Sequence, residues 1–149
     1  MQSMLTHMDN DISASQIVSD LVLIHQDRID TYTQILRGSG KIELDMKAIY
    51  ERIIEESSEY KRQLEEKLKP PSSGPGKIYK LWLMEKASVS GVDKKTILAT
   101  CATDELVTNN TYSMALSLVT NEDIRTLLEE HQQGLKKLYD HIRQYHNAQ

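Results

Sequence analysis

Four side chains of the kinds that bind metals or carry protons interrupt otherwise apolar helical stripes in this 149-residue sequence. Around Glu105, for example, the positions at helical spacing include Cys101, Tyr112, Ala115 and Val119. The four residues, each near the middle of its own predicted helix, are His25, Glu56, Glu105 and His131. In an antiparallel bundle, mid-helix positions lie at similar heights. We therefore expect these side chains to approach one another in the interior.

Three interpretations of this set are open. Two imidazoles and two carboxylates suit a divalent transition metal such as zinc, iron or manganese. The same groups can instead form a hydrogen-bonded ionic network that fixes the register of the helices without a metal. A small error in helical phase would place any of them at a solvent-exposed edge. A single unpaired charge in the interior is strongly unfavourable, so buried members must have partners.

If the four residues bind a metal, residues near them in the sequence are candidates for the rest of the site. Carboxylates within about a turn of the set are candidates for a supporting shell, and tyrosines on the same stripes are candidates to donate hydrogen bonds to the carboxylates. The carboxylates are Asp27, Asp30 and Glu59, and the tyrosines are Tyr32, Tyr60 and Tyr112. No histidine has a glutamate three residues before it, so the paired Glu-x-x-His motif of ferritin-like di-iron sites is absent from the sequence.

The elements that must position these residues are four long helices with a 3.6-residue apolar period. We predict them at about 13–36, 43–68, 93–119 and 120–145, with Asp93 as N-cap of the third and Thr120, followed by Asp123, as N-cap of the fourth. A shorter helix around Trp82, at 78–87, lies in the long connection between the second and third. We predict an all-α fold, an antiparallel four-helix bundle of the ferritin-like type, with a flexible tail at 1–12 and one domain at 13–149.

Composition narrows the classes of function. Charged residues make up 27% of the chain, aromatic residues only 5%, and the net charge is -4, without a concentrated basic region. We therefore expect no nucleic-acid partner. No stretch is apolar for long enough to span a membrane, and we expect no signal peptide and a cytoplasmic location. The single cysteine, Cys101, lies on an apolar stripe, so we expect a reduced thiol packed in the core.

The order of several short sequence features resembles a family of small, uncharacterised bacterial proteins that share a ferritin-like four-helix bundle. The resemblance covers about residues 15–143. The features are LIHQDRIDTY at 23–32, the helix at 51–64, SG at 73–74 through Trp82, GVD at 91–93, Cys101 with Asp104-Glu105, Tyr112 and YDHIR at 139–143. In such proteins a histidine usually stands where this chain has Tyr139. The resemblance implies the architecture, and the family is defined by its fold and not by an activity.

Two functions follow as hypotheses. The first is a non-catalytic binding or structural bundle, because no complete catalytic constellation is present; it would form a homo-oligomer such as a dimer, or dock on a helical partner. The segment around Trp82 would cover the bundle or offer an apolar patch for this purpose. The alternative is a metal-binding bundle that uses His25, Glu56, Glu105 and His131 in redox or stress chemistry.

Overall fold

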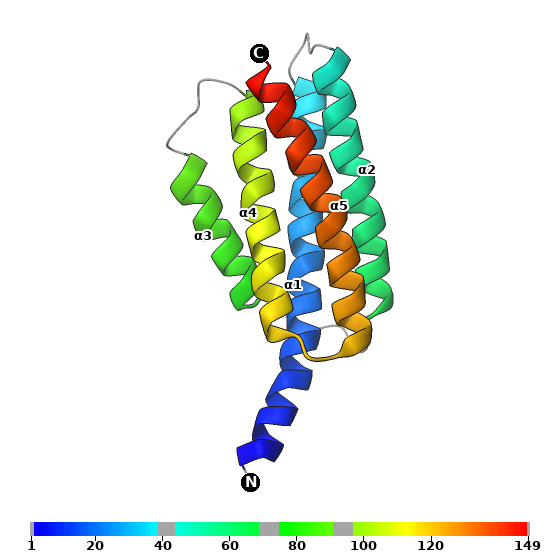
Figure 1. Cartoon of the computed structure of the whole chain (residues 1–149), viewed down its shortest axis with the longest axis vertical. Coiled ribbons are helices and arrows are strands. Elements are labelled where there is room, and N and C mark those ends of the chain that lie inside the picture. Colours follow the sequence, from blue (N-terminus) through cyan, green and yellow to red (C-terminus); the bar gives the residue numbers. More distant parts are fainter. Residues whose placement is uncertain (1, 39–43, 69–74, 91–96, 149) are drawn as a thin grey trace.

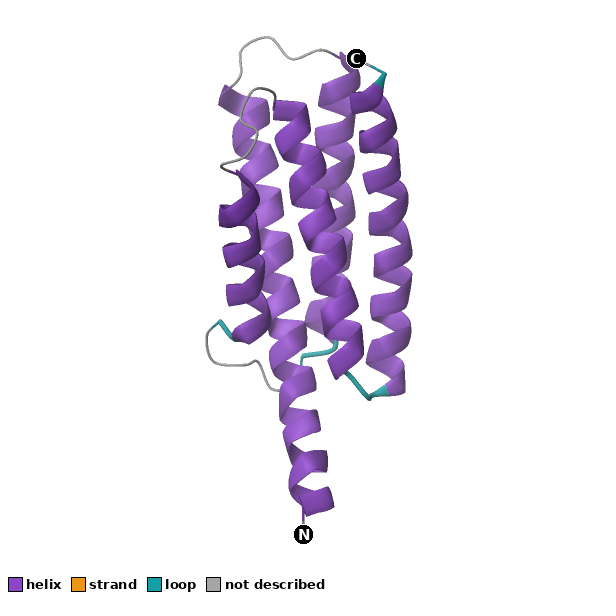
Figure 2. Ribbon diagram, turned by 60° about the vertical axis from the view of Figure 1, so that its left-hand side comes forward, coloured by secondary structure: helices purple, strands orange, loops and turns teal. Residues whose placement is uncertain are grey.

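The computed structural model describes the backbone of residues 2–38, 44–68, 75–90 and 97–148, and the side chains of these except 2–13, 88–90 and 97–99. This part of the chain forms five α-helices and no strand (Figure 2), which confirms the all-α prediction. The helices are α1 (Gln2–Gly38), α2 (Leu44–Glu66), α3 (Lys77–Ser90), α4 (Ile97–Leu118) and α5 (Glu122–Asn147). No helix among the described residues is both long and apolar enough to cross a membrane.

The four long helices form a bundle in which α1 packs on α2 and α4, and α5 packs on α4 and α2. In Figure 1, α1 and α5 run upward while α2 and α4 run downward, so each helix is antiparallel to both of its neighbours. Helices α2 and α4 are therefore diagonal and parallel, and the connection between them must return along the length of the bundle. Helix α3 provides that return, packed on α1 and α4.

Most helix ends differ from the prediction by a few residues, and the starts of α1 and α5 differ for identifiable reasons. Helix α1 begins at Gln2 and not near Ser13, because no glycine or proline interrupts the chain before Gly38; its first turns continue beyond the other helices (Figure 1). The N-cap of α5 is Asn121 and not Thr120, because Asn121 has an extended backbone and its side chain accepts a hydrogen bond from the Ile124 amide at 3.0 Å. The predicted N-cap Asp93 lies outside the described residues.

Hydrogen bonds attach helix α3 to both α1 and α4. The carboxylate of buried Asp20 on α1 accepts hydrogen bonds from the backbone amides of Gly76 and Tyr79, which caps the N-terminus of α3. A side chain at Gly76 would come within 2.7–2.8 Å of Gln16 and Asp20, so this close approach requires glycine. The indole N–H of Trp82, which is 1% exposed, donates to Thr108 Oγ1 on α4 at 3.1 Å.

The apolar core has two parts. One part has residues from all five helices and includes Leu21, Leu64, Trp82 and Leu128. The other lies nearer the C-terminal end of α1 and includes Tyr32, Ile53 and Leu138. Cys101 is a free, buried thiol in this second part, as predicted. His25, Glu56 and Glu105 come from the stretches of helix between the two parts, and His131 lies between Leu128 and Leu135 of the first part.

Candidate functional site

The structure places three of the four predicted residues in the interior and the fourth beside them. His25, Glu105 and His131 are at most 1% exposed, and Glu56 is half-buried. The imidazole centroids of His25 and His131 are 6.3 Å apart. These residues come from α1, α2, α4 and α5, so one polar layer does form in the middle of the bundle. Exposure at an edge, the third interpretation, is wrong for the two histidines and Glu105.

Arg28, which the sequence analysis did not single out, forms an ion pair with Glu105 in this layer. The two side chains are 2% and 0% exposed. Arg28 Nη2 donates to Glu105 Oε1, and Arg28 Nε lies 3.3 Å from Glu105 Oε2, so the guanidinium faces both carboxylate oxygens. Burial alone would lower the pKa of Arg28, but the Glu105 carboxylate raises it above its ordinary value. The charge of Glu105 is thus neutralised by an arginine.

A chain of hydrogen bonds crosses the layer, and its direction can be assigned from its outer end. Gln63 Nε2 donates to Glu59 Oε1 at 3.0 Å, which leaves Gln63 Oε1 facing His131 Nε2 at 2.7 Å. An amide oxygen only accepts, so the hydrogen of His131 is on Nε2. Burial lowers the pKa of His131 to about 4, so the ring is neutral at pH 7 and its Nδ1 is an acceptor. The Tyr112 hydroxyl, 3.1 Å away, therefore donates to Nδ1.

The same reasoning continues inward. Because the only hydrogen of the Tyr112 hydroxyl is engaged, its oxygen must accept from His25 Nε2, which lies 2.7 Å away. Burial, with the charge of Arg28 nearby, lowers the pKa of His25 well below its usual range, so this ring is neutral too. Its Nδ1 accepts from Ser57 Oγ at 3.0 Å, and Ser57 Oγ accepts from Arg28 Nη1 at 2.5 Å.

All donors in this chain point the same way, from the buried cation of Arg28 to the surface carboxylate of Glu59. We call the chain the polar relay; its members are Arg28, Ser57, His25, Tyr112, His131 and Gln63. Every imidazole nitrogen in it has a partner of the correct kind, and His25 Nδ1 has a second donor, Arg28 Nη1, at 3.4 Å. Both rings are therefore held in a single tautomer. Four helices contribute to the relay, and its hydrogen bonds therefore fix their relative height and rotation.

Glu56 lies beside the relay and has a different environment. Tyr60 donates a hydrogen bond to its carboxylate, whereas Glu56 Oε1 is buried without a partner. Burial raises the pKa of Glu56 to about 7, against the opposing effect of Arg28 and with a further rise caused by Glu105. Arg28 and Arg52 favour the ionised carboxylate, but burial outweighs them. The pKa of this carboxyl group therefore lies near neutral pH.

Close packing around Tyr60 explains a glycine in the middle of α5. The Tyr60 ring is stacked on His131, with centroids 3.9 Å apart and planes 14° apart. A Cβ atom built on Gly134 would lie 1.9 Å from the Tyr60 hydroxyl oxygen and 3.4 Å from Glu56 Oε2. Glycine is a poor helix former, by about 1 kcal/mol relative to alanine. At this position the absence of a side chain admits the tyrosine that stacks on the relay.

The carboxylates predicted to support a metal have other partners. Asp27 accepts from the Tyr79 hydroxyl at 2.5 Å, a contact that attaches α3 to α1. Asp30 accepts from Gln26 on the exposed side of α1. Glu59 pairs with Arg62 at the surface.

The three tyrosines predicted to donate to carboxylates have different partners. Tyr60 donates to the Glu56 carboxylate, as predicted. Tyr112 instead joins the two histidines, and Tyr32 stacks on Tyr50 in the core.

These residues do not fit a metal ion in the arrangement observed. All four imidazole nitrogens are engaged in the relay, and the guanidinium of Arg28 occupies the position beside Glu105 that a metal cation would need. Across the described part of the chain, no group of three or more His, Cys, Asp or Glu side chains has an arrangement that could hold a metal. A hydrogen-bonded ionic network is the interpretation that agrees with the geometry.

Comparison with protein-family models, with curated proteins and with solved structures finds no match. The grooves lined by described residues include one of about 660 Å³ between α4 and α5, lined by Asn110, Lys136 and Arg143 among others. Another, of about 290 Å³, lies between α2 and α5 and is lined by Arg52 and His141 among others. Neither groove is lined by a member of the polar relay.

Sequence reasoning missed Arg28, Ser57 and Gln63. Arg28 follows His25 by three residues and precedes Tyr32 by four, so the helical period does place it on the buried stripe. Ser57 likewise lies between Ile53 and Leu64 on the buried side of α2. Their burial was not predicted, because arginine and serine side chains are usually exposed. The Gln63 contact depends on the orientation of an amide across two helices, for which the sequence has no signal.

Proposed function

We propose that this protein is a non-catalytic helical bundle that acts as a binding or structural protein and associates with copies of itself. The observation that supports this most directly is the outer face of α3. Leu83 and Met84, in consecutive positions, are 42% and 67% exposed, whereas the neighbouring Trp82 is buried against α4. Helix α3 thus attaches to the bundle through one face and presents apolar side chains on the other.

We further propose that the bundle belongs to the ferritin-like type. Two antiparallel pairs, α1 with α2 and α4 with α5, together with a long connection between diagonal helices, are the features by which that type is defined. The resemblance of residues 15–143 to a ferritin-like family supports the same assignment. The short helix within the crossover is the part of the fold that carries the proposed interaction surface.

The polar relay has a structural role in this proposal. Its hydrogen-bonding groups satisfy one another, and removing one member of such a buried network leaves others unpaired. A relay of this kind selects one register of the four helices among the alternatives that apolar stripes alone would permit. A network of this kind suits a rigid scaffold better than a site that must bind and release a ligand. The relay therefore favours a binding or structural bundle over a metal-binding one.

Self-association is tested by light scattering coupled to size-exclusion chromatography over a range of protein concentrations. We expect the wild-type protein to form species larger than a monomer. The double variant Leu83→Ser, Met84→Ser should shift the population to monomer without loss of helical circular dichroism. Leu118→Ser is the matched control, because Leu118 is 47% exposed and is the last residue of α4, ten residues beyond Thr108, the partner of Trp82. A wild-type protein that is monomeric at all concentrations would refute the proposal.

A further inference from the structure

Two helices carry matching exposed stripes on opposite sides of the molecule. The exposed residues of α2 that lie furthest from the core, at spacings of four, three and four, are Leu44, Ala48, Glu51 and Glu55, with the exposed Lys47 and Arg52 on either side of them. The buried residues of α2, such as Ile53 and Ser57, are about half a turn away, so this stripe faces away from the core. Leu44 is 82% exposed. The stripe of α2 is therefore apolar at its N-terminal end and acidic further along.

The stripe of α3 has the complementary order. Its exposed residues at spacings of three, four and three are Lys77, Lys80, Met84 and Ala87, with Leu83 beside Met84. The buried residues Ile78 and Trp82 lie on the other side of this helix. The stripe of α3 is thus basic at its N-terminal end and apolar further along. Both stripes are about 15–16 Å long at 1.5 Å per residue.

The two stripes agree in register when the helices are antiparallel. Leu44 then lies opposite Ala87, and Ala48 lies opposite Met84. Glu51 lies opposite Lys80, and Glu55 lies opposite Lys77. Each step along one helix is matched to within one residue by a step along the other, so apolar side chains meet apolar ones and each carboxylate meets an ammonium group.

We propose that α3 of one copy of this chain docks antiparallel on α2 of a second copy. This inference rests on the proposed self-association and names the surface that receives α3. Helix α3 runs upward and α2 downward in Figure 1, so two copies with parallel bundle axes bring these helices together in the antiparallel sense. No rearrangement of either copy is required.

The alternative contact, α3 against α3 of a second copy, lacks this complementarity. In the antiparallel pairing of two identical α3 stripes, Lys80 lies opposite Met84 and Lys77 lies opposite Ala87. Each apolar side chain would then face a lysine, and the four ammonium groups would have no carboxylate from either stripe. Like charges at one interface disfavour association.

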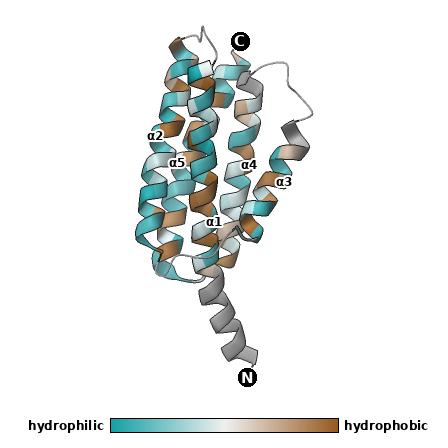
Figure 3. Cartoon of the chain, turned by 180° about the vertical axis from the view of Figure 1, so that it is seen from behind, coloured by the Kyte–Doolittle hydropathy of each residue, from teal (hydrophilic) through white to brown (hydrophobic). Residues whose placement is uncertain are grey.

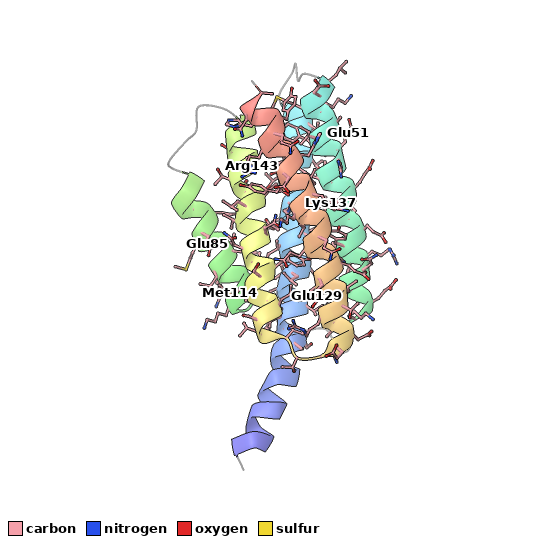
Figure 4. All side chains as sticks on the ribbon, viewed as in Figure 1. Glu51, Glu85, Met114, Glu129, Lys137 and Arg143 are labelled. Carbon is pink, nitrogen blue, oxygen red and sulfur yellow. The ribbon has the colours of Figure 1, made fainter. Side chains whose placement is uncertain are left out.

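The proposed contact has a consequence for the size of the assembly. Helices α2 and α3 lie on opposite sides of the bundle, and Figure 4 labels Glu51 and Glu85 on these two sides. Figure 3 shows the hydrophilic surface of α2 on the side away from α3. A pair joined in this way leaves one α2 stripe and one α3 stripe uncovered. Further copies therefore add head to tail, into a ring or an open chain.

Charge reversal distinguishes these contacts. The α3 variant is Lys77→Glu, Lys80→Glu, and the α2 variant is Glu51→Lys, Glu55→Lys. We expect each variant alone to associate at least about tenfold more weakly than the wild type, because two attractive pairs become repulsive. An equimolar mixture of the two variants should recover association, since each reversed stripe then meets a reversed partner. Sedimentation velocity and circular dichroism measure association and folding.

The outcomes separate this inference from the proposal on which it rests. If the wild type associates but the α2 variant associates equally well, the α2 surface is wrong while self-association stands. If the α3 variant loses association and the mixture does not recover it, the pairing of α3 with α2 is also wrong. If the wild type does not associate, both proposals fail.

Discussion

Replacing Tyr112 by Phe removes one oxygen atom from the middle of the polar relay and leaves the ring in place. The wild-type hydroxyl accepts from His25 Nε2 at 2.7 Å and donates to His131 Nδ1 at 3.1 Å. The variant leaves one donor and one acceptor without partners in a layer where both histidines are at most 1% exposed. Each buried unsatisfied group costs about 1–3 kcal/mol, so we expect the two together to lower the free energy of unfolding by about 2–6 kcal/mol.

Urea denaturation followed by circular dichroism measures this loss, at one fixed protein concentration because self-association adds to apparent stability. Tyr139→Phe is the matched control, since Tyr139 lines the open groove between α4 and α5; we expect its effect to stay within about 0.5 kcal/mol. A Tyr112→Phe variant as stable as this control would refute the argument that the relay holds the helices together.

Three further predictions concern the neighbours of the relay and the attachment of α3. Gly134→Ala should destabilise the protein by about 1–3 kcal/mol despite the better helix propensity of alanine, and Tyr60→Phe in the same chain should recover part of the loss, which a double-mutant cycle measures. Glu56 has a folded-state pKa of about 7, above its unfolded value, so its carboxyl group stabilises the fold at low pH and this contribution is lost as the pH rises through 7. The stability of the wild type relative to Glu56→Gln should therefore fall by about 2 kcal/mol between pH 5 and pH 8, and a pH-independent difference would contradict the raised pKa. Trp82→Ala should cost about 3–5 kcal/mol in unfolding experiments, whereas Leu83→Ser should change stability little; equal effects would show that α3 does not attach through Trp82.

The sequence predicted the helices well because each long helix has an apolar stripe and most are bounded by strong breakers. The short helix around Trp82 was predicted at 78–87 and is observed at Lys77–Ser90. The errors lie at helix ends: α1 continues back to Gln2 because no glycine or proline interrupts it, and a single side-chain hydrogen bond decides where α5 begins. Asn121 displaced Thr120 as the N-cap of α5 for this reason.

The candidate site could be predicted only in part. Helical phase correctly placed His25, Glu105 and His131 inside, because burial follows from the 3.6-residue period. The helical period does not predict which partner a buried carboxylate will have. In this protein the partner of Glu105 is Arg28, which lies on the same face of α1 as His25. The relay also depends on the contact between α1 and α2, which places Ser57 beside His25, and such contacts between helices have no sequence signal.

The direction of the hydrogen bonds from Arg28 to Glu59 fixes the tautomers of His25 and His131, and these tautomers can be measured directly. Nitrogen chemical shifts of the labelled imidazoles in the native protein distinguish the two neutral tautomers from the cation. The structure predicts that His25 and His131 are both neutral at pH 7 with the hydrogen on Nε2, that both remain so at pH 5.5, and that zinc or iron(II) leaves their signals unchanged. An Nδ1–H tautomer for either ring, a cationic ring at pH 7, or a stoichiometric shift on adding metal would contradict the relay.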